Sequence, residues 1–479
     1  MSQVKSIFNN IGWLFVPQIL SSICGFIWTV LIANYLGVNG NGILGFAISL
    51  SGILAVTTDF GISTHIVRHV STDHSQAPIY LGNAIPLKSL FGIGTFILTL
   101  IILIILKTDE LTITITLLFT IEMIINSFKG LFNGCFQAFE VGKYQGIGNI
   151  LTTALLFIFI LIAIFTDLGI YGITLAYVIS NLIVLLYTYG ALRKHIARPN
   201  FEINITFWKK LTLVALPFAA TGILYSIYYS IDVIMLKALV GNYATGIYNA
   251  TYKLVSVLTL FYSIYTAVIF PIMSKFFKND ETLLIVSFEK SIKYLMFIII
   301  PLAFATVYYS AEVIHIIYPS GEFANASSVL NILIWTVCLL FISGACNTLL
   351  NASHKEVSVT KIYLIAATFN VILNFFMIPK YSYNGAAITT VLSDIIIVLL
   401  QSYVIYKLGF RPNKRLYKDL VKIIIGSVFI SGVLNILHMD MILAIPVSIT
   451  IYLIIMYLLN IFDNDDKYVI KEIIGKKSI

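Results

Sequence analysis

Uncharged apolar runs of about twenty residues recur along this chain, and they restrict its fold more than any other feature. A run of this length crosses the hydrocarbon core of a bilayer as an α-helix, whereas membrane strands alternate in polarity over about ten residues. Composition agrees, because 59% of the 479 residues are hydrophobic and only 11% are charged. The sequence therefore predicts an all-α integral membrane protein.

The predicted transmembrane helices number about fourteen, within a range of twelve to fourteen. Lys and Arg are concentrated in alternate loops, above all in the stretch 191–210, whereas the opposite loops hold only Lys107, Lys237 and Lys380. Because positively charged loops stay in the cytoplasm, both termini are predicted to be cytoplasmic. Membrane topology thus explains the formal net charge of +8, and we expect no nucleic-acid partner.

Short loops leave no room for an enzymatic domain. The GKKS sequence near the C-terminus lacks the upstream glycine of a phosphate-binding loop. The four cysteines fall in predicted spans at spacings that fit neither a metal site nor a disulfide framework. We therefore expect a protein that is not an enzyme, with no catalytic residue, no metal and no cofactor.

Three pairs of segments resemble each other in the same order, at offsets of about 204 to 214 residues. The pairs are LGVNGNGI (36–43) with LVGNYATGI (239–247), GCFQAFE (134–140) with TLLNASH (348–354), and GITLAYVISN (172–181) with GAAITTVLSD (385–394). Each copy contains six predicted spans, and an even number gives both copies the same orientation. Transporters with such parallel repeats bind substrate between the halves, near the middle of the membrane.

The repeat predicts two parallel six-helix lobes that enclose a central cavity. The expected domains are an N-terminal lobe at 1–190, a basic cytoplasmic linker at 191–210, a C-terminal lobe at 211–407, two additional transmembrane helices at 408–460 and a cytoplasmic tail at 461–479.

Polar residues lie on single faces of several predicted spans. In the fourth span, Glu122, Asn126 and Lys129 recur at helical spacing, and the line continues toward the cytoplasm. Asp232 of the seventh span and Lys253 of the eighth are expected at similar depth on neighbouring helices, where they can neutralise each other. Charged groups inside a membrane are costly and usually face a cavity or a partner.

These faces predict a water-accessible cavity with an excess of lysine, which suits an anionic headgroup because ammonium groups bind phosphate as point charges. The substrate-binding candidates are Lys253, Lys129, Lys88, Asn249, Tyr225, Tyr228 and Asn126. The candidates for ion coupling or charge pairing are Asp232, Glu122, Asp394 and Asp59. Simpler roles stay open, because lysines can extend to the membrane surface, Asp59 can cap its span, and tyrosines can anchor spans at the interface.

Several short motifs carry a family resemblance over nearly the whole chain. They include Leu36-Gly37, Gly42-Ile43 and Asp59-Phe60-Gly61, then FQAFEVGKY at 136–144 and NGAA at 384–387. In these motifs the chain resembles Wzx-type polysaccharide-repeat flippases, whose superfamily includes multidrug-and-toxin-extrusion (MATE) transporters and lipid II flippases. The arginine that often precedes the family's first glycine pair is absent, since this chain reads ANY at 33–35.

The resemblance implies two lobes around a V-shaped cavity and transport by alternating access. The implied substrate is an undecaprenyl-pyrophosphate-linked oligosaccharide, moved from the inner to the outer leaflet of a bacterial cytoplasmic membrane with coupling to an ion. The product would serve O-antigen, capsule or a related polysaccharide, with membrane lipid, a polymerase and glycosyltransferases as partners. A self-contained cavity makes a monomer the simpler expectation.

Two other functions are weighed against this one. A MATE-like cation-coupled drug antiporter would need acidic residues to dominate its cavity, whereas lysines equal or exceed the acids here. A scaffold of a polysaccharide synthesis complex without transport would have no need of polar faces in the middle of the membrane.

Overall fold

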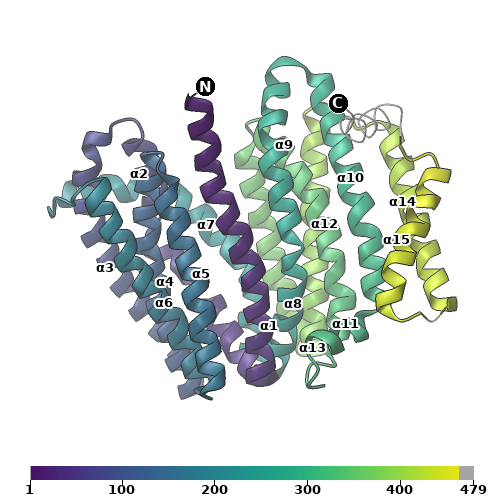
Figure 1. Cartoon of the computed structure of the whole chain (residues 1–479), viewed down its shortest axis with the longest axis horizontal. Coiled ribbons are helices and arrows are strands. Elements are labelled where there is room, and N and C mark those ends of the chain that lie inside the picture. Colours follow the sequence, from purple (N-terminus) through teal and green to yellow (C-terminus); the bar gives the residue numbers. More distant parts are fainter. Residues whose placement is uncertain (1, 438, 463–479) are drawn as a thin grey trace. The chain divides into compact units, whose positions relative to one another are not determined.

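The computed structural model describes residues 2–437 and 439–462. Within these residues every regular element is a helix, as the sequence predicts (Figure 1). Eleven of the described helices are long and apolar enough to cross a membrane, or up to twelve if the bent pair Glu281–Tyr308 and Ser310–Ile317 is one span. The chain is thus a multi-pass helical membrane protein. The tail predicted at 461–479 lies almost wholly outside the described residues.

The helices follow one another with short connections. Those of the N-terminal half are α1 (Ser2–Asp59), α2 (Ile62–Val70), the 3₁₀ helix η1 (His74–Gln76), α3 (Ala77–Ile105), α4 (Glu110–Ala138), α5 (Gly142–Phe165), α6 (Gly169–His195) and α7 (Ile205–Leu239). Those of the C-terminal half are α8 (Asn242–Val257), α9 (Thr259–Asn279), α10 (Glu281–Tyr308), α11 (Ser310–Ile317), α12 (Ala326–Ala352), α13 (Glu356–Lys407), α14 (Lys414–Leu437) and α15 (Met441–Leu458).

The chain forms two compact units. One consists of Met1–Leu260 with Ala367–Thr389, and the other of Phe261–Ala366 with Thr390–Ile479. Every predicted site residue except Asp394 belongs to the first unit. The contacts described below lie within one unit or the other.

Two helices are too long for a single span. With 58 and 52 residues, α1 and α13 would each be more than twice as long as the ~30 Å hydrocarbon core. Each contains one residue outside helical geometry, namely Gly37 (φ 67°) in α1 and Ser382 (φ 52°) in α13. Each therefore consists of two helical segments that meet at this residue.

Residues with positive φ recur at corresponding places of the segment pairs found in the sequence. Gly37 corresponds to Gly241 (φ 113°), and Glu140 (φ 56°) corresponds to His354 (φ 58°). Ser382 likewise corresponds to Gly169 (φ 61°). Positive φ is uncommon, above all in a non-glycine residue such as Glu140 or His354. Its occurrence at matching positions of both members of a pair indicates that the paired segments have similar local backbone conformations.

The predicted basic linker is bound to the N-terminal half. The Asn200 N–H donates to the carbonyl of Pro78 at 3.0 Å, and the Asn204 N–H donates to the Asn83 side chain at 3.2 Å. A Cβ at Gly82 would lie 1.6 Å from the Asn200 carbonyl oxygen, so this approach requires glycine. The linker is thus fixed along the start of α3.

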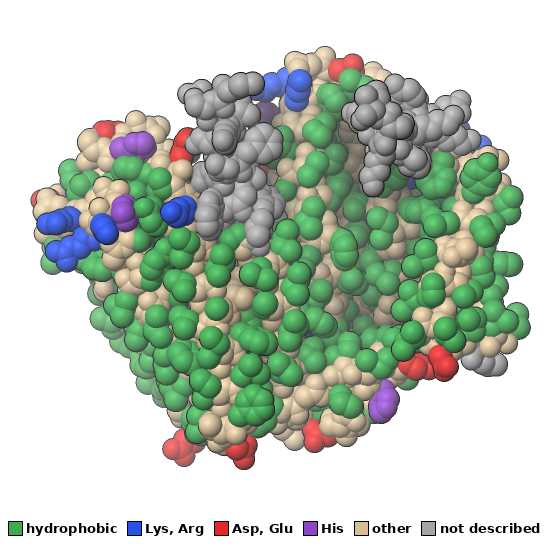
Figure 2. All heavy atoms as spheres, in the orientation of Figure 1, with side chains coloured by type: hydrophobic (Ala, Val, Ile, Leu, Met, Phe, Trp, Pro, Cys, Tyr) green, Lys and Arg blue, Asp and Glu red, His purple; other side chains and the backbone are tan. Residues whose placement is uncertain are grey.

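The outward faces of the helices carry the apolar side chains that lipid would contact. On α3, Ile93, Ile97 and Ile101 recur every four residues and are each about half exposed. Figure 2 shows such side chains along the visible helices, with most charged side chains near the helix ends. The buried charged residues behind these apolar faces are therefore the places to look for a functional site.

Candidate functional site

A buried charged network joins α4, α5 and α6. The Glu122 carboxylate, on a side chain only 3% exposed, accepts a hydrogen bond from Asn181 at 2.7 Å and another from Asn126. Lys129 donates to Asn181 at 2.5 Å, to Asn126 at 3.1 Å and to the Thr152 hydroxyl at 3.3 Å. The acid and the base are therefore bridged by two amides, and all three ammonium hydrogens of Lys129 are used.

The structure brings together the face predicted on the fourth span. Glu122, Asn126 and Lys129 share one side of α4 and point toward α6, so Lys129 does not extend to the membrane surface. The central residue, Asn181, was absent from the predicted site. Its sequence signal was its place in the repeated segment 172–181, where it corresponds to Asp394.

Lys88 lies in a separate buried ion pair. Its side chain is 1% exposed and its ammonium contacts the Asp59 carboxylate, the Ser63 hydroxyl at 3.2 Å and the Ser127 carbonyl at 2.7 Å. Lys88 thus neither reaches the membrane surface nor offers a hydrogen to a substrate in this conformation. Asp59 does more than cap its helix, because it is the counter-charge that allows Lys88 to be buried.

Asp232 accepts hydrogen bonds from two neutral donors. Its carboxylate accepts hydrogen bonds from the Tyr248 hydroxyl at 2.8 Å and from the Asn374 amide at 2.5 Å. Asn374 in turn donates to Asn370 at 2.9 Å. The ion pairs described within residues 2–437 and 439–462 do not include one between Asp232 and Lys253, and their mutual neutralisation stays a prediction.

Of the other predicted residues, some are buried in contacts between helices and the rest are partly exposed. Asn249 is buried between α1 and α8, where its amide donates to the Asn41 side chain at 3.2 Å. Tyr228 is buried, whereas Tyr225 is 42% exposed. Lys253 is partly exposed on α8, and Asp394 is half-buried on α13 in the second unit.

The second segment of α1 and the start of α8 approach each other through two glycines. A Cβ at Gly42 would lie 2.1 Å from the Asn242 carbonyl oxygen, and a Cβ at Gly246 would lie 1.9 Å from the Val38 carbonyl oxygen. One sequence offset relates Gly42 to Gly246 and Val38 to Asn242, so the contact is reciprocal. The Asn41 amide also donates to the Gly246 carbonyl at 3.0 Å.

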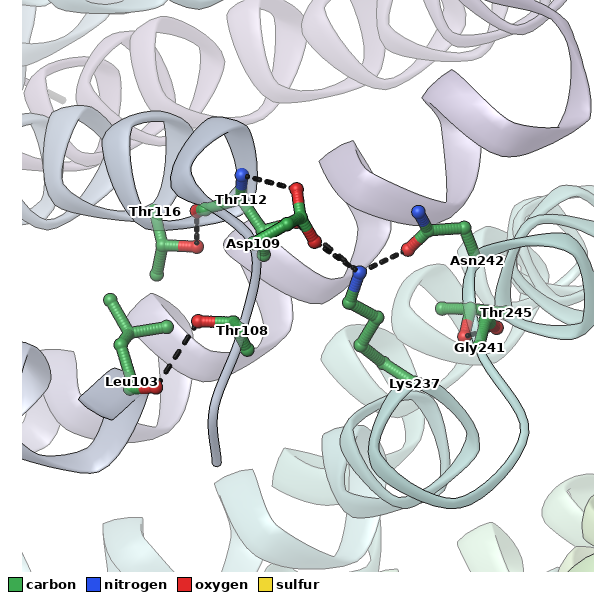
Figure 3. A network of polar contacts seen from close by, with 9 residues as sticks. All are labelled: Leu103, Thr108, Asp109, Thr112, Thr116, Lys237, Gly241, Asn242 and Thr245. Carbon is green, nitrogen blue, oxygen red and sulfur yellow. Dashed lines mark hydrogen bonds and ion pairs between the residues drawn. The ribbon is translucent and has the colours of Figure 1, made fainter. Parts of the chain in front are cut away.

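A polar network lies at the same end of these helices (Figure 3). Lys237, at the end of α7, donates to Asp109 at 3.1 Å, to the Thr112 hydroxyl at 3.2 Å and to the Asn242 side chain. Partial burial of Asp109 opposes its ionisation, but the hydrogen bonds from Thr112 and Lys237 outweigh it and hold the pKa of Asp109 at about 2. The network ties the start of α4 to the α7–α8 turn.

Comparison with solved structures defines the class of fold. The structure is similar to a lipid II flippase MurJ in an inward closed conformation, with a TM-score of 0.77 and 17% identity over 92% of this chain and 97% of that one. It is also similar to an inward-facing multidrug resistance MATE family transporter, with a TM-score of 0.66 and 14% identity over 84% of this chain and 99% of that one. The fold is therefore that of the MurJ and MATE transporters.

Sequence comparison then gives the family. The family described as polysaccharide biosynthesis protein matches residues 7–277, and the lipid II flippase MurJ family matches residues 226–457. The chain belongs to the polysaccharide biosynthesis protein family, as the motifs predict. It is 25% identical to the capsular polysaccharide biosynthesis protein CapF of Staphylococcus aureus, over 83% of this chain and 99% of that protein. It is 24% identical to the probable low-salt glycan biosynthesis flippase Agl15 of Haloferax volcanii, over 88% of each.

Proposed function

We propose that this protein is a flippase that moves a polyprenyl-pyrophosphate-linked oligosaccharide from the inner to the outer leaflet by alternating access. The buried network of Glu122, Asn181 and Lys129 carries the proposal. Charged side chains inside membrane spans are costly, and they usually mark the pathway of a polar substrate or an ion. Family membership and the named flippase relative support the class of substrate. No covalent bond changes in such a reaction.

The proposed topology has fourteen spans, with α1 and α13 each counted as two. Two parallel six-helix lobes, at 1–190 and 211–407, would enclose the route, and α14 and α15 would be the additional spans. The matched positive-φ residues of the paired segments support the repeat. The Lys and Arg distribution supports cytoplasmic termini. The proposal further takes a bacterial cytoplasmic membrane as the location, undecaprenol as the carrier and a monomer as the working unit.

In this proposal the lysines bind the pyrophosphate while the sugars cross within the polar route. Lys129 is held by two neutral amide oxygens and one hydroxyl, which are weaker partners than a phosphate oxygen. A phosphate could therefore replace Asn181 as its acceptor. Lys253 is the second candidate, since its side chain is partly exposed. Lys88 is reassigned to structure because Asp59 already neutralises it.

Asp232 is the proposed coupling residue. Its carboxylate accepts a hydrogen bond from the Asn374 amide, which also donates to Asn370. The buried Asn374 Oδ1 has no hydrogen-bond partner among the described residues. Carboxylate and amide oxygens together can hold a small cation, or the carboxylate can carry a proton. Glu122 and Asp394 are the other candidates.

A cellular experiment tests the proposal. In the organism of origin, removal of this chain should leave the lipid-linked oligosaccharide in the inner leaflet, where an impermeant glycosidase added to spheroplasts cannot cleave it. Complementation should fail with Lys129→Ala or Lys253→Ala, whereas Lys380→Ala, which removes an exposed lysine from α13 close to its kink at Ser382, should restore transfer. Unchanged leaflet distribution after removal would overturn the proposal.

A further inference from the structure

The second unit contains a cavity of about 320 Å³ at the ends of α9, α12 and α13. Three apolar and three polar residues line it, namely Phe277, Leu408 and Phe410 with Glu281, Ser353 and Lys355. No residue of the predicted transport site belongs to this lining. The Lys and Arg distribution predicts that this end of the helices faces the cytoplasm.

The turn that follows α12 has the same backbone hydrogen bonds as the turn that follows α4 in the first copy of the repeat. In the second copy, three successive N–H groups donate at 3.0, 3.1 and 2.9 Å, from Ser353 to Leu349, from His354 to Asn351 and from Lys355 to Leu350. In the first copy, the corresponding bonds measure 3.0, 3.0 and 2.9 Å and run from Phe139 to Cys135, from Glu140 to Gln137 and from Val141 to Phe136. The two turns are therefore equivalent frames that hold different side chains.

The side chains differ most at the first position of the turn. In the first copy, the Phe139 ring stacks on His74, with ring centroids 4.2 Å apart and an interplanar angle of 17°. His74 also contacts the Ala138 carbonyl at 3.1 Å, so this aromatic pair closes the end of α4. Ser353 occupies the corresponding position of the second copy and leaves open the space that an aromatic side chain takes up in the first.

The polar groups of the cavity are not satisfied by one another. Ser353 is only 4% exposed, and its hydroxyl has no hydrogen-bond partner among the described residues. Glu281 and Lys355 are exposed at the rim, and within the described part of the chain they form no ion pair with each other or with a third group. A buried hydroxyl without a partner is costly, which indicates a place for a bound polar molecule.

The chemistry of the lining restricts what this molecule can be. Glu281 repels a phosphate or another anion, Lys355 repels a cation, and a purely apolar molecule leaves the Ser353 hydroxyl unpaired. A neutral sugar ring fits all three conditions, because its hydroxyls both donate and accept hydrogen bonds. Its apolar C–H face also suits the rings of Phe277 and Phe410. The cavity volume lies at the lower end of the ~300–1,000 Å³ range of small-molecule pockets.

We propose that this cavity binds a neutral sugar unit of the lipid-linked oligosaccharide on the cytoplasmic side, before transfer. Glu281 accepts hydrogen bonds from the sugar hydroxyls, Lys355 and Ser353 donate to them, and the ring face contacts Phe277 and Phe410. The inference rests on the proposed function for the source of the sugar. It assigns selection of the oligosaccharide to the second unit, whereas the lysines of the first unit bind a pyrophosphate that is the same for every oligosaccharide.

Saturation-transfer NMR of the full chain in detergent tests the site. The probe is the oligosaccharide released by mild acid from the lipid-linked pool of the organism of origin. Its ring protons should receive saturation from the unchanged protein but not from Ser353→Phe, which places the aromatic side chain of the first copy in the cavity. Glu281→Gln and Lys355→Gln should each weaken binding about tenfold, since each loses a hydrogen bond to a charged group. The control Lys278→Gln removes an exposed cation outside the lining and should leave binding unchanged.

Two results would overturn the proposal. They are absence of saturation transfer from the unchanged protein, and equal saturation transfer from Ser353→Phe. Should Ser353→Phe fail to fold, the rim variants Glu281→Gln and Lys355→Gln decide, and unweakened binding in both would refute the site. A parallel assay of leaflet transfer separates this inference from the proposed function. Transfer without sugar binding refutes the cavity alone, whereas sugar binding without transfer refutes the flippase and leaves a sugar site in the second unit.

Discussion

Two substitutions that together move the negative charge from position 122 on α4 to position 181 on α6 test the geometry of this network. The first of them, Asn181→Asp, adds a second carboxylate. In Asn181→Asp the side chain still accepts from Lys129, but it loses the hydrogen that it donates to Glu122 at 2.7 Å. One hydrogen bond to a charged group is worth about 1.5–3 kcal/mol. Two adjacent buried carboxylates also repel each other unless one takes up a proton. We expect a loss of about 3 kcal/mol of stability at neutral pH, which grows as the pH rises.

The double variant Glu122→Gln with Asn181→Asp should recover most of this loss. The amide introduced at position 122 then donates to the new carboxylate at position 181, which also accepts from Lys129. The charge and the hydrogen bond between positions 122 and 181 are thus restored in exchanged positions, and only the bond from position 181 to the Tyr177 carbonyl at 3.0 Å is lost. Thermal unfolding in detergent can be followed with a thiol-reactive dye, because Cys135, Cys338 and Cys346 are buried until the protein unfolds. The double variant should be more stable than the sum of its single variants predicts, by about 2 kcal/mol.

A control shows whether the rescue is specific. Asp59→Asn also removes a negative charge, but from the separate pair with Lys88. Combined with Asn181→Asp it should give no rescue. Additive losses in Glu122→Gln with Asn181→Asp, or equal rescue by Asp59→Asn, would refute the bridged network.

Three further predictions use the same unfolding assay or a transport assay. Gly246→Ala should lower the thermal midpoint by several degrees because its Cβ would lie 1.9 Å from a backbone oxygen, whereas Gly52→Ala, with no atom within 4 Å, should not. The Asp109 pKa of about 2 lies below the ordinary 3.8, so its stabilisation is complete above pH ~4 and lost as the pH falls toward 2. Asp109→Asn should remove this acid dependence, worth at most about 1 kcal/mol because the side chain is half exposed. Asp232→Asn and Asn374→Ala should each impair transport, and the double variant should lose less than the product of the two effects because the residues share one hydrogen bond.

The fold class could be read from the sequence because long apolar runs leave few alternatives in a bilayer. Helical spacing also placed Glu122, Asn126 and Lys129 correctly on one face, since these residues belong to a single helix. The positive-φ residues Gly37 and Gly241 lie at the turns that the segment comparison singled out.

Contacts between helices were harder to predict. Spacing within one helix does not determine which neighbour a side chain meets, so Asn181 was missed as the partner of Lys129, and Asn374 as the partner of Asp232. Nor does the spacing of polar residues within α3 indicate that the Lys88 ammonium contacts the Asp59 carboxylate at the end of α1. In each case the sequence leaves open which sides of two helices face each other.

Translocation in vesicles that hold the protein in one orientation is the most direct test of flippase activity. Vesicles would contain a radiolabelled polyprenyl-pyrophosphate oligosaccharide with and without the purified protein, and an impermeant glycosidase would report the leaflet that holds the sugar. We expect transfer that depends on the protein and is lost in Lys129→Ala. Absence of transfer, together with proton-driven efflux of a cationic dye, would contradict it and favour a drug antiporter.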